Sequence, residues 1–387
     1  MALPDETTAP NILEEHFQDI GTDVEVEQLP DDAELSSGKP WNPDDIRVST
    51  KQFSLRNVMD MIEDGSLELA PEFQRNRVWK VPQKSRLIES VLLQIPLPAF
   101  YFAEDADGLL RVVDGLQRLS TINAFVRGGE DTGFALKGLE YLTEEGKRFS
   151  DLGTALQRRI NNAQIVVHVI DPTTPREVTY DIFKRINTGG TPLNAQEIRH
   201  SMSKDRSRDI LRDLAATEEF NAATNNLYNQ VRMTDREMAL RFCAFWIFGV
   251  DEYLKLRAME PFLERTTAAL DDPAEVPDDK VADLRAAFTR AMHNSYLVFG
   301  KHAFRKWPYG TESLNPVNRA LFEAWSISLT DFGPDDLTRR RELIVAEARR
   351  LMTDDVTYLY AITASTGDAQ RVRYRFSTTR DAARAGL

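Results

Sequence analysis

The feature that most constrains the fold of this chain is a change in hydrophobic periodicity near residue 200. Before that point, short alternating or apolar segments of strand length are interleaved with segments of helical periodicity. Beyond it, strand-like segments nearly vanish and long amphipathic segments follow one another. The 387 residues are enough for two compact domains of about 150 residues each. We therefore expect an α+β domain followed by an all-helical domain.

The individual segments predict a mixed α+β arrangement in the first domain. Strands are expected over residues 47–53, 99–103, 109–113 and 164–170, and helices over 55–63, from the turn containing Pro82 to Gln94, 116–126 and 175–185. The acidic turn between the second and third strands predicts a β-hairpin. In the second domain, helices are expected over 205–216, 235–248, 252–270, 278–299, 317–329 and 335–352.

The negative charge of the chain is concentrated at its N-terminus. Residues 1–45 hold 13 Asp and Glu against one Lys, whereas the rest of the chain is close to neutral. Such a segment cannot bury enough apolar surface to offset its ordering entropy, so it is expected to be a disordered acidic tail. It is either a solubilising leader or an arm that mimics DNA or docks a partner. The expected domains are therefore 1–45, 46–203 and 204–387, and a chain starting at Ile46 is expected to fold.

Several classes of protein are excluded by what the sequence lacks. No apolar run of about 18 residues is present and the N-terminus does not resemble a secretory signal, so we expect no membrane span and a cytoplasmic location. The single cysteine, Cys243, lies in an apolar helical pattern and is expected to be buried and inert. No phosphate-binding P-loop and no zinc-ligand spacing is present. The pair His293-Asn294 lies in a helical pattern and does not indicate a nuclease site.

The strongest candidate site lies where a buried strand ends at Asp114-Gly115 and a helix begins. Free backbone N–H groups and the helix dipole favour an anion at such a turn, glycine allows a ligand to approach the backbone, and Arg118 adds a forked donor. Asp114 is a candidate ligand for a divalent cation or a water, and Gln117 is a candidate to orient that water. The alternative is that Asp114 caps the helix and that Gln117 and Arg118 are surface residues.

Two further segments combine polar donors with aromatic residues or glycines. In residues 70–79, Gln74, Arg75 and Trp79 suit a nucleotide base and its phosphates, although Trp79 could instead be a core residue. In residues 183–197, Asn187 and Thr188 precede two glycines. Asn194 and Glu197, further along, are explained by a helix-capping box.

Taken in this order, the three motifs Phe-Gln-Arg-x-x-Val-Trp, Asp-Gly-x-Gln-Arg-Leu-Ser-Thr and Arg-Ile-Asn-Thr-Gly-Gly-x-x-Leu-x-x-x-Glu resemble the domain-of-unknown-function 262 family over about residues 50–200. That family resembles ParB and sulfiredoxin in fold. It includes the NTP-hydrolysing half of GmrSD-like and phosphorothioate-linked phage restriction proteins. The sequence departs from the family at Leu116, where Gln is usual, which removes one polar group from the motif.

The resemblance implies a function and assigns residues to it. Asp114, Gly115, Gln117 and Arg118 match the nucleotide-hydrolysis motif, and Gln74 and Arg75 match the upstream conserved pair. We expect a nucleoside triphosphate, GTP or another, as ligand, with Mg²⁺ as cofactor and with DNA or a separately encoded His-Asn-His nuclease as partner. Two alternatives stay open, a non-enzymatic ParB-like DNA-binding or adaptor module and a DNA nickase that uses the same motif.

Overall fold

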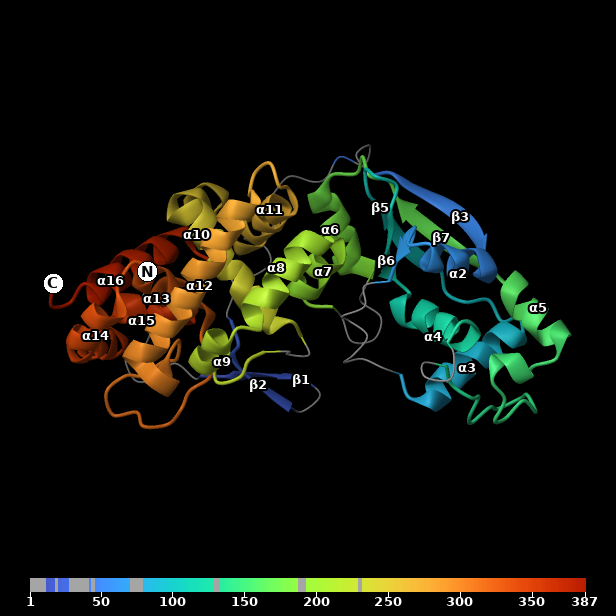
Figure 1. Ribbon diagram of the computed structural model, residues 1–387, viewed down its shortest axis with the longest axis horizontal. Coiled ribbons are helices and arrows are strands. Elements are labelled where there is room, and N and C mark those ends of the chain that lie inside the picture. The colour runs from blue at the N-terminus through green and yellow to red at the C-terminus, as the bar shows by residue number, and fades with distance from the viewer. Residues whose placement is uncertain are drawn as a thin grey trace, which may run out of the picture. The chain divides into compact units, whose positions relative to one another are not determined.

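The computed structural model describes residues 12–17, 20–27, 42, 46–69, 79–128, 133–186, 193–228 and 232–387. It divides into two compact units. The sheet unit comprises Pro40–Met202, and the helical unit comprises Met1–Lys39 together with Ser203–Leu387. The N-terminal segment therefore belongs to the same unit as the C-terminal half of the chain (Figure 1).

The sheet unit is built on a mixed five-stranded sheet in the order β3-β7-β5-β6-β4. Its strands are β3 (Val48–Ser54), β4 (Leu67–Glu68), β5 (Phe100–Glu104), β6 (Leu110–Asp114) and β7 (Gln164–Ile170). The β5–β6 hairpin is antiparallel, as is the β3–β7 pair, whereas β7 runs parallel to β5 and β4 runs parallel to β6. The order brings strands that are distant in sequence next to the hairpin.

Helices cover both faces of this sheet (Figure 1). They are α2 (Leu55–Glu63), α3 (Val81–Leu92), α4 (Leu116–Val126), α5 (Thr154–Asn162), α6 (Arg176–Ile186) and α7 (Ala195–Met202), with a 3₁₀ turn at Phe149–Asp151. Alternate strand residues such as Phe102, Val112 and Val167 pack with α2 to α5 in the larger core. The opposite face packs Val113 and Ile170 against α6 and α7. Both faces bury apolar side chains, because strand residues alternate between them.

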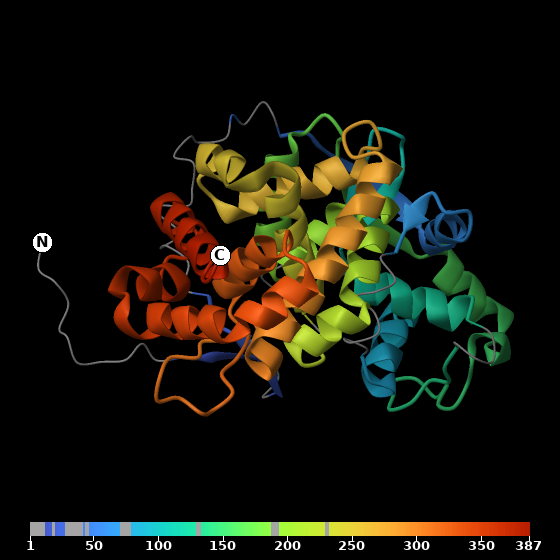
Figure 2. The ribbon, with the colours of Figure 1, turned by 60° about the vertical axis from the view of Figure 1, so that its left-hand side comes forward.

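The helical unit contains the remaining helices, several of which lie against one another (Figure 2). They are α8 (Asp205–Ala215), α9 (Glu218–Thr224), α10 (Thr234–Leu256), α11 (Met259–Asp271), α12 (Asp278–Phe299), α13 (Arg319–Leu329), α14 (Pro334–Asp354), α15 (Val356–Thr363) and α16 (Ala369–Ala383), with a 3₁₀ turn at Gly300–His302. Helix α10 is kinked at Gly249, whose backbone is not helical. In the described part of the chain, no helix has both the length and the apolarity needed to cross a bilayer.

The N-terminal segment contributes a β-hairpin, β1 (Glu14–Phe17) and β2 (Ile20–Glu25), to the helical unit. Val24 is fully buried in the helical core, and backbone hydrogen bonds join β2 to Val317. This corrects the expectation that residues 1–45 form a disordered tail, as far as the described residues reach. The expectation fails because net charge counts only repulsion inside the segment and not the cations that other segments provide.

The cations that pair with carboxylates of this N-terminal segment come from the helices or from the segment between α12 and α13. Arg305 pairs with Asp23 at 2.6 Å, Lys306 with Glu25 at 2.5 Å, Arg319 with Glu15 at 2.8 Å and Arg241 with Glu27 at 2.6 Å. We call these four pairs the hairpin ion pairs. All four cationic side chains are less than a tenth exposed. Burial works to raise the pKa of Glu27, but the charges of Arg241 and Arg319 outweigh it and hold that pKa below its ordinary value of 4.5.

The structure confirms the mixed α+β class of the first domain and the helical character of the second. The predicted bounds of α4, β7 and α12 coincide with the observed ones, and the predicted hairpin is β5–β6. The sequence did not predict β4, α5, α9 or α15, and it did not distinguish a helix from a strand at α16. Helices α5, α9 and α15 are short, and their hydrophobic periodicity extends over only two or three turns.

Candidate functional site

The turn between β6 and α4 depends on glycine for two independent reasons. Gly115 has φ +96°, a left-handed conformation that other residues adopt at a cost. A Cβ atom added there would lie 2.2 Å from Cδ1 of Phe100, so the backbone and the buried ring are in close contact. The turn therefore brings the start of α4 directly against the beginning of β5.

Asp114 and Arg118 form an ion pair across the first turn of α4. Nη2 of Arg118 donates to Oδ2 of Asp114 at 2.7 Å. The Asp114 side chain is 36% exposed, whereas that of Arg118 is 14% exposed. The residue that caps the helix is Gly115, so the alternative interpretation of Asp114 as a helix cap is wrong. Its carboxylate is instead directed to Arg118 and partly open to solvent.

Arg118 also holds the chain that enters β5. Its Nη1 donates to the carbonyl of Pro98 at 2.5 Å, its Nη2 donates to the carbonyl of Ala99 at 3.3 Å, and the guanidinium lies 4.2 Å from the centre of the Phe100 ring. Burial lowers the pKa of Arg118 although the Asp114 carboxylate works in the opposite direction. Among the described residues, three bonds use three of the five N–H groups of this guanidinium, so it can donate further to an anion.

The N-terminus of α4 has the properties of an anion site. The first N–H groups of a helix have no acceptor within the helix. In the described part of the chain, no side chain caps this end. The positive end of the helix dipole lies at the same position, and Arg118 is in the first turn. A phosphate or another oxyanion would find backbone donors and a guanidinium together here.

The structure places only some of the other predicted site residues. Gln117 is half-buried in the first turn of α4, and Trp79 packs against the core formed with α2 to α5. Gln74, Arg75, Asn187 and Thr188 lie outside the described residues. The predicted capping box is confirmed at the start of α7.

That capping box consists of two reciprocal hydrogen bonds. The backbone N–H of Asn194 donates to Glu197 at 2.7 Å, and the backbone N–H of Glu197 donates to Asn194 at 2.8 Å. Both side chains thus have a structural role in starting the helix.

Strand pairing adds residues that no sequence motif indicated. Tyr101 lies opposite Asp114 across β5 and β6, after a register shift that leaves Val113 as an extra residue. Tyr101 also lies opposite His168 on β7, and His168 lies opposite Thr50 on β3. We call these four residues, Asp114, Tyr101, His168 and Thr50, the cross-strand row. Periodicity could not reveal it, because its members come from four strands whose order is set by tertiary packing.

At the turn between β6 and α4, Asp114 offers one carboxylate to a divalent cation. Among the described residues, no group of three or more His, Cys, Asp or Glu side chains is arranged to hold a metal ion. Mg²⁺ is commonly held by one or two carboxylates together with substrate phosphates and water, so a phosphate ligand would have to supply most of the coordination. Asp114 fits that limited role.

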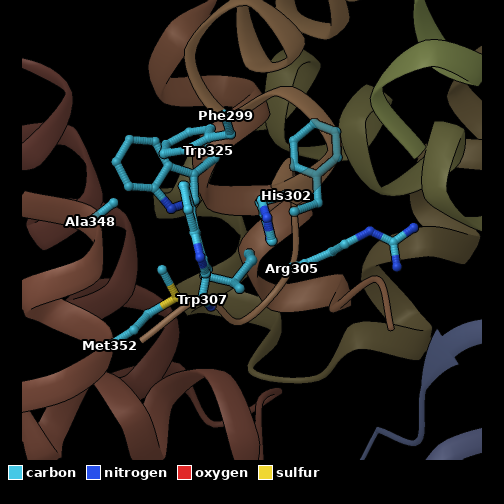
Figure 3. A pocket seen from close by; sticks show the side chains of 9 residues that line it. Phe299, His302, Arg305, Trp307, Trp325, Ala348 and Met352 are labelled. Atoms are coloured by element: carbon cyan, nitrogen blue, oxygen red, sulfur yellow. Dashed lines mark hydrogen bonds between the residues drawn. The ribbon is translucent and has the colours of Figure 1, made fainter. Parts of the chain in front are cut away.

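The helical unit contains a small cavity that does not involve any predicted site residue. Its volume is about 10 Å³, which suits about one water molecule. The rings of His302 and Trp307 are stacked with centroids 4.1 Å apart, and both line the cavity (Figure 3). Within the described structure, Nδ1 of His302 and Nε1 of Trp307 have no hydrogen-bond partner. The cavity is far smaller than the roughly 300 Å³ that a small-molecule site occupies.

Comparison with known families gives one result that agrees with this geometry. The family model described as GmrSD restriction endonuclease, N-terminal domain, matches residues 55–203. This range contains the β6–α4 turn and all but Thr50 of the cross-strand row. No curated protein matches the chain.

Proposed function

Because the family model described as GmrSD restriction endonuclease, N-terminal domain, matches residues 55–203, we propose that the sheet unit binds and hydrolyses a nucleoside triphosphate as part of a DNA restriction system. The observation that carries the proposal is the N-terminus of α4, which follows a buried strand through Gly115 and which no side chain among the described residues caps. Backbone N–H groups there suit phosphate oxygens. The ParB-like fold implied by the resemblance is part of the same proposal.

The residues of the turn have distinct roles in this proposal. The N–H groups of α4 and the remaining donors of Arg118 hold phosphate oxygens. The half-exposed Asp114 accepts a proton from an attacking water, and Gln117 orients that water. Mg²⁺, when bound, would be held by the phosphates and Asp114 and would neutralise phosphate charge. Gln74, Arg75, Asn187 and Thr188 are proposed as further contacts to the nucleotide from the two other motifs.

The partner is proposed from the restriction family. Such a system must cut DNA, and neither a metal cluster among the described residues nor a suitable histidine pair in the sequence indicates a nuclease centre in this chain. His293, the histidine of the His-Asn pair, is exposed on α12. We therefore propose that the helical unit couples the nucleotide state to DNA or to a separately encoded His-Asn-His nuclease.

Calorimetric titration with the four common triphosphates and magnesium tests the proposal. Wild type is expected to bind at least one of them with a Kd below about 1 mM, the weak end of specific ligand binding. Arg118→Ala is expected to weaken binding by roughly 10- to 100-fold, the value of a charge-assisted hydrogen bond to phosphate. The matched control is Arg86→Ala, which removes an arginine that is 61% exposed on α3 of the same unit.

Thermal melting of each variant is needed beside the titration, because Arg118 also binds the carbonyls of Pro98 and Ala99. If a folded wild-type protein binds none of the triphosphates below about 1 mM, the nucleotide proposal fails. The non-enzymatic adaptor would then be the better interpretation.

A further inference from the structure

The cross-strand row extends away from the phosphate end of the proposed site, and this inference rests on the proposed function. Residues directly opposite one another in a sheet direct their side chains to the same face. The extra residue Val113 re-aims the end of β6, because bulges change which face a side chain occupies. By strict alternation Asp114 would face the same core as Val112, whereas the observed register pairs it with Tyr101.

The two middle residues of the row, Tyr101 and His168, form a defined aromatic pair. The rings of Tyr101 and His168 have centroids 4.9 Å apart and are tilted by 39°. Nδ1 of His168 is 3.0 Å from Oγ1 of Thr50, and this hydrogen bond fixes the orientation of the imidazole. Both rings are half-buried and Thr50 is exposed. The ring pair is therefore partly open to solvent, although Tyr101 also packs against the core under α6 and α7 that contains Ile170.

The length of the row sets the size of a ligand that could use both ends. Adjacent strands are about 4.8 Å apart, so Asp114 on β6 and His168 on β7 are separated by two strand spacings, about 10 Å. A single phosphate is too small to contact both Asp114 and His168. A nucleotide has this extended form, with a charged phosphate chain at one end and a flat base at the other. Tyrosine and histidine rings are side chains on which bases stack.

We propose that Tyr101 and His168 form the binding platform for the nucleobase of the triphosphate whose phosphates lie at the N-terminus of α4. Thr50 holds the imidazole in the orientation that the base requires. The chemistry of this platform is stacking, so it contributes to affinity for any nucleoside triphosphate and contributes nothing to affinity for phosphate alone. This separates its role from that of Arg118.

The test compares a nucleoside triphosphate with inorganic tripolyphosphate by calorimetry, both with magnesium. Wild type is expected to prefer the nucleoside triphosphate by on the order of 10-fold, the contribution of one stacked base. Tyr101→Leu and His168→Gln, which remove a ring and retain similar bulk or polarity, are expected to lower that preference several-fold and to leave tripolyphosphate affinity unchanged. Tyr101→Phe retains the ring and is expected to keep the preference.

The matched control is Val166→Ala, since Val166 is exposed on the same face of β7, two residues from His168. It should bind both probes as wild type does. Equal wild-type affinity for the two probes, or equal losses for both in the ring variants, would overturn the platform while leaving the phosphate site intact. If wild type binds neither probe, the proposed function itself is wrong, and so is the assignment of Tyr101 and His168 as a base-binding platform.

Discussion

Ion pairs have different roles in the two units of this chain. In the sheet unit, Asp114 and Arg118 are four residues apart, and the carboxylate is partly exposed beside the N-terminus of α4. In the helical unit, Arg241 is buried and contacts Glu27, 214 residues earlier, and Glu323. A charge that is partly open to solvent is available to a ligand, whereas buried and mutually satisfied charges determine how distant segments assemble.

The same contrast explains what the sequence could predict. The β6–α4 turn is local, so Asp114, Gly115 and Arg118 were identified from adjacent residues and the bounds of α4 were predicted correctly. Tyr101 and His168 are brought beside them by strand order and by the extra residue Val113, which no periodicity reveals.

The N-terminal hairpin was missed for a related physical reason. Its acidic residues look unfavourable when the segment is considered alone. Arg305 and Lys306, which neutralise Asp23 and Glu25, lie more than 280 residues away. Composition of a segment therefore predicts disorder only when no other part of the chain supplies the opposite charge.

Removal of the N-terminal hairpin should give the largest effect on stability. A chain starting at Ile46 loses all four carboxylates of the hairpin ion pairs together with the buried Val24. Removal of one partner from a buried pair costs about 3–5 kcal/mol, so we expect the unfolding free energy of the helical unit to fall by more than about 4 kcal/mol. Urea unfolding followed by tryptophan fluorescence measures this.

A chain starting at Ile12 retains the hairpin and serves as the control for shortening the chain. It should unfold at the same urea concentration as the full chain. Unfolding of the Ile46 chain within about 1 kcal/mol of wild type would restore the interpretation of the segment as a dispensable tail, since exposed pairs contribute no more than that.

Glu323→Gln should lower the unfolding free energy slightly less, by about 3–5 kcal/mol, because it removes the carboxylate that pairs with the buried Arg375. Glu323 is fully buried, accepts from Arg241 at 2.5 Å and also pairs with Arg375. The control is Glu347→Gln, which breaks a half-exposed pair with Arg350 and should cost at most about 1 kcal/mol. Similar unfolding free energies for the two variants would remove the distinction between buried and exposed pairs in this unit.

Gly115→Ala tests the local geometry of the sheet unit. A left-handed backbone costs a non-glycine residue about 1–2 kcal/mol, and the contact with Phe100 should add about 1–3 kcal/mol of overpacking. Gly65→Ala is the control, because Gly65 also has a positive φ, +80°, but no atom of the described residues lies within 4 Å of a Cβ added there. The difference between their melting curves measures the contact with Phe100. No difference would show that the ring moves aside.

The central claim is that the partly exposed carboxylate of Asp114 in the sheet unit serves chemistry and not stability, and Asp114→Asn tests it most directly. Asparagine retains an oxygen that accepts from Arg118, and loss of a partly exposed pair should change the unfolding free energy by at most about 1 kcal/mol. The variant lacks the negative charge that is proposed to accept a proton from the attacking water. Phosphate release from the triphosphate, measured beside urea unfolding, should therefore fall by on the order of 100-fold while the fold is retained. Unchanged phosphate release in the folded variant would contradict the claim, and so would a loss of release that merely follows unfolding.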